Sequence, residues 1–165
     1  MKNQKTLNLV QAAMIAAIYV VLVLIFNYWS FGVIQFRIAE ALTILPYFTP
    51  AAIPGLFVGC FLANLLGGSV IGDVVFGSLA TLIGAVGTYF AGKAKIKWLA
   101  PIPPIAANTL IVPFVLKYCY GAQEAVPYMM LTVGIGEVIV CGVFGGLLLA
   151  VVEKNRNYIF RQGTN

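Results

Sequence analysis

The sequence contains no histidine, few acidic residues and little charge of either sign. Only five of its 165 residues are Asp or Glu, and ten are Lys or Arg. The lack of histidine excludes His-dependent nucleophilic catalysis and His-ligated zinc. GxSxG and Walker A sequences are also missing, so the sequence offers neither a hydrolase elbow nor a phosphate-binding loop. We therefore expect no enzyme activity.

The low charge indicates a membrane protein. Charged residues make up 9% of the chain, against about 25% of an ordinary soluble domain. Hydrophobic residues make up 61%, and the mean hydropathy is +0.97. Too few polar side chains remain to cover a soluble globule of this size, so lipid must contact most of the outer surface. We expect one integral membrane domain over residues 1–165.

The three cysteines do not indicate a metal site or a disulfide framework. They are odd in number, far apart and without a CxxC pair. Cys60 and Cys141 are expected to pack as small apolar residues within helices. No cofactor is expected in this chain.

Apolar runs divide the chain into six predicted helices, so the expected fold is an all-α membrane bundle. The first run has about the 20 residues needed to cross roughly 30 Å of hydrocarbon. It lacks the small-x-small cleavage site of a signal peptide, so we expect it to be a retained helix. The second and third runs are short and bounded by prolines. The predicted helices cover about residues 7–26, 37–48, 54–66, 74–91, 101–120 and 127–152.

Basic residues gather at three places that flank apolar runs. The positive-inside rule puts such clusters in the cytoplasm. Both termini are then cytoplasmic, and the loops between helices one and two, three and four, and five and six face outside. A nucleic-acid site would need basic groups on one accessible face, so no nucleic-acid partner is expected. The clusters are Lys2 and Lys5; Lys93, Lys95 and Lys97; and Lys154, Arg156 and Arg161.

Small residues recur at every fourth position on several predicted helices, which lets helices approach closely. The first helix has two such registers side by side, Ala12 with Ala16 and Ala13 with Ala17. Together they form a broad alanine face near the cytoplasmic end. This face suits packing inside the bundle and docking of another membrane protein equally well.

Polar residues at membrane depth are the candidate functional groups, because an ionisable group there costs at least about 2.5 kcal/mol unless it is sheltered. Glu137 lies ten residues, or about 15 Å, into the sixth predicted helix. Under the deduced topology the polar residues all fall in the outer half of the membrane. We expect them to converge, with nearby aromatic residues, on an outward-facing pocket that includes Arg37, Glu40, Asn64, Asp73, Asn108, Glu137, Trp29 and Tyr118.

Simpler roles stay open for several of these residues. Arg37 and Glu40, three apart, could form a salt bridge at a helix start, and Asp73 could be an N-cap. Asn108 could satisfy backbone carbonyls that nearby prolines leave free. Glu137 is hardest to explain by structure alone, because an acid at mid-membrane needs a specific partner.

The pocket chemistry suits a flat, donor-rich heterocycle or a cation. Carboxylates accept paired N–H donors, amides both donate and accept, and tyrosine and tryptophan rings stack on flat ligands.

Several stretches of the sequence resemble the QueT family. They are AAMIAAIYVVL at 12–22, QFRIAEALTILPYF at 35–48, GCFLANLLGG at 59–68 and GDVVFGSLATLIGA at 72–85. The resemblance extends over nearly the whole chain and is most specific over residues 35–85. Members of this family are substrate-binding (S) components of energy-coupling factor (ECF) importers.

The resemblance implies a six-helix S-component fold that binds its ligand near the extracellular side. Such subunits do not hydrolyse ATP but associate with the transmembrane coupling protein EcfT and two cytosolic ABC ATPases, which use it. Small alanines on the first helix contact EcfT in the family, and Ala12, Ala13, Ala16 and Ala17 match that pattern. The implied substrates are queuosine precursors, 7-deazaguanine bases such as the aminomethyl and cyano forms or queuine.

Two other interpretations remain open at this point. One is an S component for another vitamin, and the other is a small secondary transporter that works alone. The buried acids could relay protons in a secondary transporter, but the short chain shows no internal repeat.

Overall fold

The computed structural model describes residues 2–26 and 37–155, and every regular element within them is helical. The α-helix α1 leads into a 3-10 helix, η1, and the last helical stretch contains a π-helical segment, η3. The elements are α1 (Lys2–Ile25), η1 (Ile38–Tyr47), α3 (Ala52–Leu66), α4 (Ile71–Lys93), the 3-10 turn η2 (Lys97–Leu99), α5 (Ile102–Tyr118), α6 (Val126–Glu137), η3 (Val138–Phe144) and α7 (Gly145–Lys154).

Four helical stretches are long and apolar enough to cross a membrane: Gln4–Ile25, Ile71–Lys93, Lys97–Tyr118 and Val126–Lys154. The other two apolar helices, η1 and α3, have 10 and 15 residues. At about 2.0 and 1.5 Å per residue each is shorter than the roughly 30 Å of a hydrocarbon core. The predicted all-helical fold is confirmed, while the number of segments that cross the membrane stays a prediction.

Local geometry differs from the prediction at three of the helices. The second predicted helix is a 3-10 helix with Pro46 inside it, a residue that has no N–H to donate. The sixth continues from α6 through η3 into α7, so a π-helical segment interrupts it. The predicted N-cap role of Asp73 is wrong: Val70 holds that position, and Asp73 lies inside the first turn of α4 with a buried side chain.

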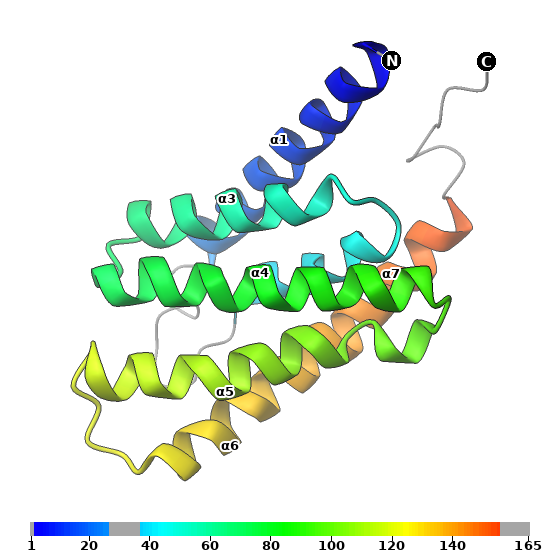
Figure 1. The fold of residues 1–165 in the computed structure, drawn as a ribbon. Coiled ribbons are helices and arrows are strands. Elements are labelled where there is room, and N and C mark those ends of the chain that lie inside the picture. Colours follow the sequence, from blue (N-terminus) through cyan, green and yellow to red (C-terminus); the bar gives the residue numbers. More distant parts are fainter. Residues whose placement is uncertain (1, 27–36, 156–165) are drawn as a thin grey trace.

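The bundle is built around η1. Figure 1 shows α3, α4 and α5 side by side, with α6 and α7 running diagonally behind them. Helix α4 packs against both α3 and α5, and α1 packs against α3. The short η1 contacts α1, α3, α4, η3 and α7, so residues on it face most of the other elements.

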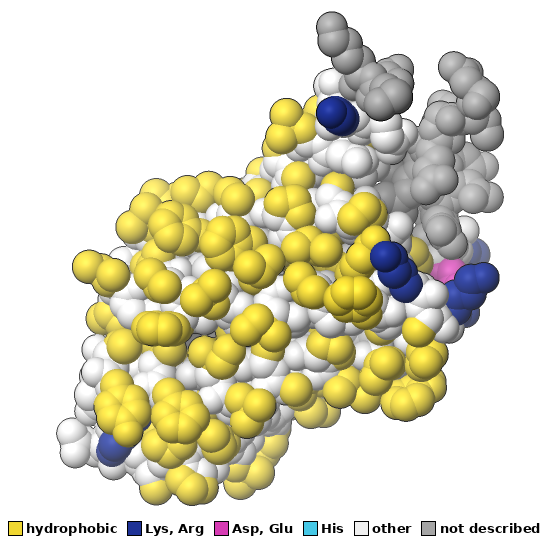
Figure 2. Space-filling model, in the orientation of Figure 1, with side chains coloured by type: hydrophobic (Ala, Val, Ile, Leu, Met, Phe, Trp, Pro, Cys, Tyr) yellow, Lys and Arg dark blue, Asp and Glu magenta, His cyan; other side chains and the backbone are white. Residues whose placement is uncertain are grey.

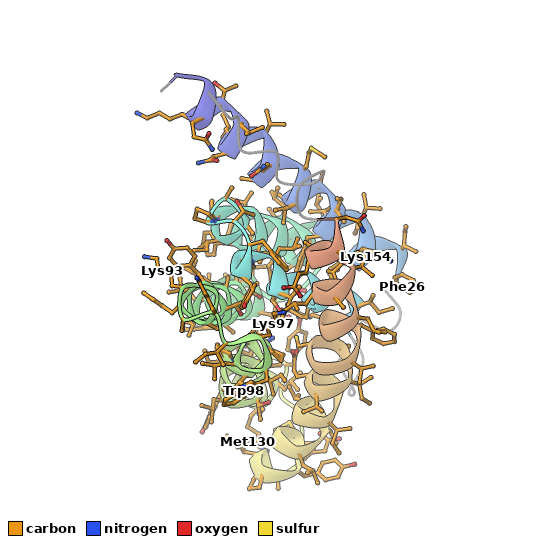
Figure 3. All side chains as sticks on the ribbon, turned by 90° about the vertical axis from the view of Figure 1, so that its right-hand side faces the viewer. Phe26, Lys93, Lys97, Trp98, Met130 and Lys154 are labelled. Carbon is orange, nitrogen blue, oxygen red and sulfur yellow. The ribbon has the colours of Figure 1, made fainter. Side chains whose placement is uncertain are left out.

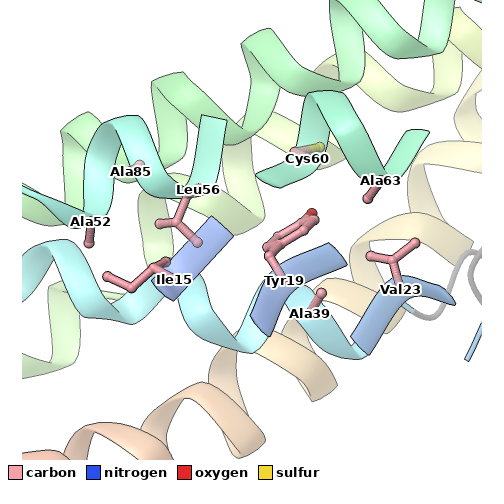
Figure 4. Packing of buried hydrophobic residues seen from close by; sticks show 9 residues of the cluster. All are labelled: Ile15, Tyr19, Val23, Ala39, Ala52, Leu56, Cys60, Ala63 and Ala85. Carbon is pink, nitrogen blue, oxygen red and sulfur yellow. The ribbon is translucent and has the colours of Figure 1, made fainter. Parts of the chain in front are cut away.

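Glycine and alanine bring α1 and α3 into close contact. A Cβ added at Gly55 would lie 2.7 Å from the carbonyl oxygen of Ala12, and one added at Gly59 would lie 3.0 Å from the Cα of Ala16. The side chains of Tyr19 and Leu56 fill the space between these helices and are fully buried (Figure 4). Small residues on both helices therefore set the spacing at which the larger core side chains fit.

Hydrophobic side chains are spread over the whole face shown in Figure 2, and only a few basic side chains appear on it, mostly toward its edges. Figure 3 looks onto one end of the bundle, where Lys93, Lys97 and Lys154 are labelled. At this end Lys97 Nζ lies 2.8 Å from Glu153 Oε1 and links η2 to the end of α7. Two predicted cytoplasmic clusters thus share one end of the molecule.

Candidate functional site

A buried ion pair joins the start of η1 to the first turn of α4. Arg37 Nη2 lies 2.8 Å from Asp73 Oδ2, and the two side chains are 6% and 0% exposed. The Tyr120 hydroxyl donates a hydrogen bond of 3.0 Å to the same carboxylate oxygen. Sequence reasoning allowed a pair between Arg37 and Glu40, but the structure gives Arg37 a partner 36 residues away.

Glycine makes room for this ion pair. A Cβ added at Gly77 would lie 2.6 Å from Asp73 Oδ1 and 3.2 Å from Asn64 Nδ2. Asn64 donates a hydrogen bond of 3.2 Å to the backbone carbonyl of Asp73 and is 1% exposed. The Asp73 carboxylate and the Asn64 carboxamide thus lie against the backbone of α4 at Gly77, where there is no side chain.

Glu40 lies near the middle of the bundle and is 1% exposed. The Tyr19 hydroxyl donates to its Oε1 at 2.5 Å, and the Thr81 hydroxyl lies 3.2 Å from the same oxygen. Its backbone carbonyl accepts a hydrogen bond of 2.6 Å from Thr43. Side chains from α1 and α4 thus fix the carboxylate of a residue that belongs to η1.

Glu137 ends α6, directly before the π-helical segment, and is 6% exposed. Asn108 on α5 donates to its Oε1 at 3.0 Å, and the Cys141 thiol lies 3.2 Å from its Oε2. π-helical turns are rare and often mark functional sites. Here the unusual backbone lies beside an acid that two neighbouring groups hold in place.

Two cysteines connect these groups into one cluster, buried except for Tyr120, which we call the polar network. Cys60 Sγ lies 3.6 Å from Asn64 Nδ2 and 3.4 Å from Thr81 Oγ1. Cys141 Sγ lies 3.4 Å from the carbonyl oxygen of Glu40. The polar network consists of Tyr19, Arg37, Glu40, Thr43, Cys60, Asn64, Asp73, Thr81, Asn108, Tyr120, Glu137 and Cys141.

The structure brings together the six polar residues predicted for the site, but not the two predicted aromatic residues. Tyr118 is 78% exposed and its ring stacks on that of Phe114, with centroids 6.4 Å apart. Trp29 lies outside the described residues. Lys117 donates hydrogen bonds to the backbone carbonyls of Ala122 and Glu124, in the loop after α5.

Sequence reasoning missed the hydroxyls and thiols of the polar network. Tyr19 and Thr81 occur inside apolar runs, where a lone hydroxyl carries no signal of its partner. Cys60 and Cys141 were expected only to fill space, yet both contact polar side chains. Their helical spacing is the one available signal, because Cys60 and Asn64, like Glu137 and Cys141, are four residues apart.

Two apolar grooves lie apart from the polar network. One, of about 310 Å³, is lined by α4 and α5 side chains that include Phe76, Phe114 and Tyr118. The other, of about 440 Å³, lies between α5 and the α6–η3 stretch. Their apolar linings suit lipid chains rather than a polar ligand.

The two alanine registers of α1 face different ways. Ala16 is buried against Gly59, and Ala12 contacts Gly55. Ala13 and Ala17 are exposed. One register therefore packs inside the bundle, and the other is available on its surface.

Two comparisons of the sequence with known proteins point to the same family. The sequence profile of a family described as the QueT transporter matches residues 9–154. Over 85 residues the chain is 36% identical to a protein of Lactococcus lactis subsp. cremoris (strain MG1363) named Queuosine precursor transporter QueT. That stretch is 50% of each chain, so the match spans about half the length of the relative. No solved structure matches the chain.

Proposed function

The chain belongs to the QueT transporter family, and we propose that it is the S component of an ECF importer, binding queuosine precursors at the outer side of the cytoplasmic membrane. The proposed ligands are 7-deazaguanine bases: the aminomethyl form, the cyano form or queuine. The named function of the Lactococcus relative supports this substrate class.

The observation that carries the proposal is the polar network itself. It places the carboxylates of Glu40 and Glu137 and the carboxamides of Asn64 and Asn108 in the interior of an apolar bundle. The edge of a guanine-like base presents adjacent N–H donors, which a carboxylate accepts in pairs. In lipid, groups this costly to bury are retained chiefly for a function.

The proposed orientation follows from the basic residues. Lys93, Lys97 and Lys154 lie at one end of the bundle, and the positive-inside rule assigns that end to the cytoplasm. The loop of Tyr120, which bonds Asp73, belongs to the opposite end of α5. In this orientation the Arg37–Asp73 pair lies toward the outside, the side from which a precursor would arrive.

The proposed partners are the coupling protein EcfT and two ABC ATPases, which hydrolyse ATP while this chain holds no cofactor. The exposed register of α1 supports a docking role. Ala13 and Ala17 are both exposed and form a small-residue strip next to Met14 and Ile18, which are 59% and 47% exposed. A small-residue surface of this kind lets a second membrane helix approach closely.

Uptake in cells tests the proposal. We expect the radiolabelled aminomethyl or cyano form of 7-deazaguanine to accumulate in a queuosine-deficient host only when this chain is expressed with EcfT and both ATPases. An ATPase variant without hydrolysis should abolish accumulation. Accumulation without any coupling protein would identify a stand-alone secondary transporter instead. If the complete complex accumulates another vitamin but no deazaguanine, the substrate assignment is wrong.

A further inference from the structure

The interior of the bundle contains more acidic than basic side chains. Glu40, Asp73 and Glu137 are 1%, 0% and 6% exposed, and the buried base among the described residues is Arg37. Arg37 pairs with Asp73 at 2.8 Å, and among the described residues no salt bridge within 4 Å reaches Glu40 or Glu137. Residues 27–36 contain no Lys, Arg, Asp or Glu and therefore add no charge to this balance.

The lysines of residues 2–26 and 37–155 whose side chains the structure describes do not neutralise the two glutamates. Lys5, Lys93, Lys95, Lys97 and Lys154 are exposed. The remaining described lysine, at position 117, donates to backbone carbonyls in the loop after α5. A buried carboxylate without a counter-charge destabilises the folded protein, so two acids without a salt bridge in the same interior favour the binding of a positive charge.

A cysteine thiol connects Glu137 to the backbone of Glu40. The Cys141 thiol is 3.2 Å from Glu137 Oε2 and 3.4 Å from the backbone carbonyl oxygen of Glu40. The hydroxyl of Thr43 lies 2.6 Å from that carbonyl oxygen and 3.6 Å from the same thiol. The Cys141 thiol thus links the carboxylate of Glu137 on α6 to the backbone of Glu40 on η1.

One carboxylate oxygen at this site has no protein donor among the described residues. Glu40 Oε2 is fully buried, and no described residue hydrogen-bonds to it, whereas Oε1 accepts from Tyr19. In contrast, both oxygens of Glu137 have partners, Asn108 and Cys141. Buried acceptors are almost always satisfied, and an unsatisfied one destabilises the folded protein, most of all when it is charged. A hydrogen bond from a ligand donor to Oε2 of Glu40 would therefore contribute more to the binding free energy than one to an oxygen that already has a partner.

We propose that Glu40 and Glu137 form a dicarboxylate site for a ligand cation, a primary ammonium group carried on a flat heterocycle. This inference rests on the proposed function, and within the 7-deazaguanines it selects the aminomethyl base over the uncharged cyano base. The ammonium has three N–H donors and no acceptor, which matches the unpaired Oε2 of Glu40 and a second carboxylate in the same interior. A nitrile presents only an acceptor, so it gains nothing there and leaves both acids uncompensated.

Calorimetric titration of the purified protein with the aminomethyl and cyano forms of 7-deazaguanine tests this site. We expect the aminomethyl form to bind about 10- to 100-fold more tightly, the factor that one net hydrogen bond to a charged group contributes. In Glu40→Gln and Glu137→Gln this preference should fall toward unity, because affinity for the charged form drops more than affinity for the nitrile. Glu153→Gln, at an exposed position, should keep both affinities.

The outcomes separate this inference from the proposed function. Equal affinity of the wild type for both forms, or a preference for the nitrile, would overturn the dicarboxylate site and leave the precursor-binding proposal intact. The wild-type comparison needs no variant to fold. A preference that persists unchanged in both Gln variants would also refute it. If neither form binds, the dicarboxylate inference fails, and the proposed substrate class fails as well unless queuine binds.

Discussion

Arg37 Nη2 lies 2.8 Å from Asp73 Oδ2, and this buried pair connects the start of η1 to the first turn of α4. Tyr120, from the loop after α5, donates to the same oxygen. Three segments far apart in sequence therefore meet at one charge pair. A buried ion pair is costly to form, because both charges lose their hydration. Removing one partner costs still more, because the other charge then stays buried without a counter-charge or water.

Arg37→Met should destabilise the protein by about 3–5 kcal/mol, the usual cost of leaving one partner of a buried pair uncompensated. The double variant Arg37→Met/Asp73→Asn removes both charges and should recover part of that loss. Unfolding of the detergent-solubilised protein measures both effects. A double variant no more stable than Arg37→Met would show that the instability of Arg37→Met does not come from the unpaired charge of Asp73.

Gly55→Ala should lower stability by about 1–3 kcal/mol, as overpacking of a close-packed core does. The added Cβ would lie 2.7 Å from the carbonyl oxygen of Ala12, and backbone on α1 has little freedom to yield. Gly146→Ala is the matched control, since no neighbouring atom of the described residues lies within 4 Å of its added Cβ. The control should be neutral or stabilising by up to about 1 kcal/mol, because alanine favours helix. Equal melting temperatures for the two variants would contradict this account of the α1–α3 contact.

Ala17→Trp should block transport while leaving ligand binding by the isolated chain unchanged. The side chain at position 17 is exposed, so a larger residue fits the folded chain but obstructs a helix that docks there. Co-purification with EcfT and cellular uptake are the measurements. Leu147→Trp, at a 61% exposed position on α7, is the control and should retain both. Full uptake by Ala17→Trp would show that the coupling protein does not dock on the exposed alanine register.

The Lys97–Glu153 pair should make a small, pH-dependent contribution to stability. Its hydrogen bond to Glu153 raises the pKa of Lys97 above the ordinary value of 10.5. A raised folded-state pKa means that the contribution is fully present below pH 10.5 and is lost as the pH rises through the folded value. Glu153→Gln should therefore melt slightly below the wild type at about pH 8. The difference should disappear at strongly alkaline pH and shrink in high salt.

A melting difference between wild type and Glu153→Gln that grows with pH would have the wrong sign for this pair. The effect is expected to be small because both side chains are solvated, at 58% and 43% exposure.

The sequence was sufficient to predict the long helices and which polar residues are buried together. The length of each apolar run was enough to locate every long helix to within about five residues. Backbone N–H and C=O groups must be hydrogen-bonded in lipid, and a single apolar segment can achieve this only as a helix. The cost of burying charge in lipid likewise singled out Glu40, Asp73 and Glu137. These inferences depend only on composition along the chain.

Pairing within the site could not be inferred from the sequence. Arg37 and Glu40 are local neighbours, yet Arg37 pairs with Asp73 and Glu40 with Tyr19. The 3-10 geometry of η1 and the packing of α4 decide this choice, and neither has a sequence signal. The alanine face of α1 was ambiguous for the same reason: which register meets α3 depends on the rotation of one helix against another.

The most direct test of the account is a thermal-shift screen of the purified protein. The ligands are 7-deazaguanines, guanine, riboflavin and thiamine, each at a concentration well above a micromolar dissociation constant. A ligand that binds only the folded state at about 100 times its dissociation constant stabilises it by about 2.7 kcal/mol, which raises the melting temperature by several degrees. We expect this shift with at least one 7-deazaguanine and no shift with riboflavin or thiamine. A shift with riboflavin or thiamine alone would contradict it.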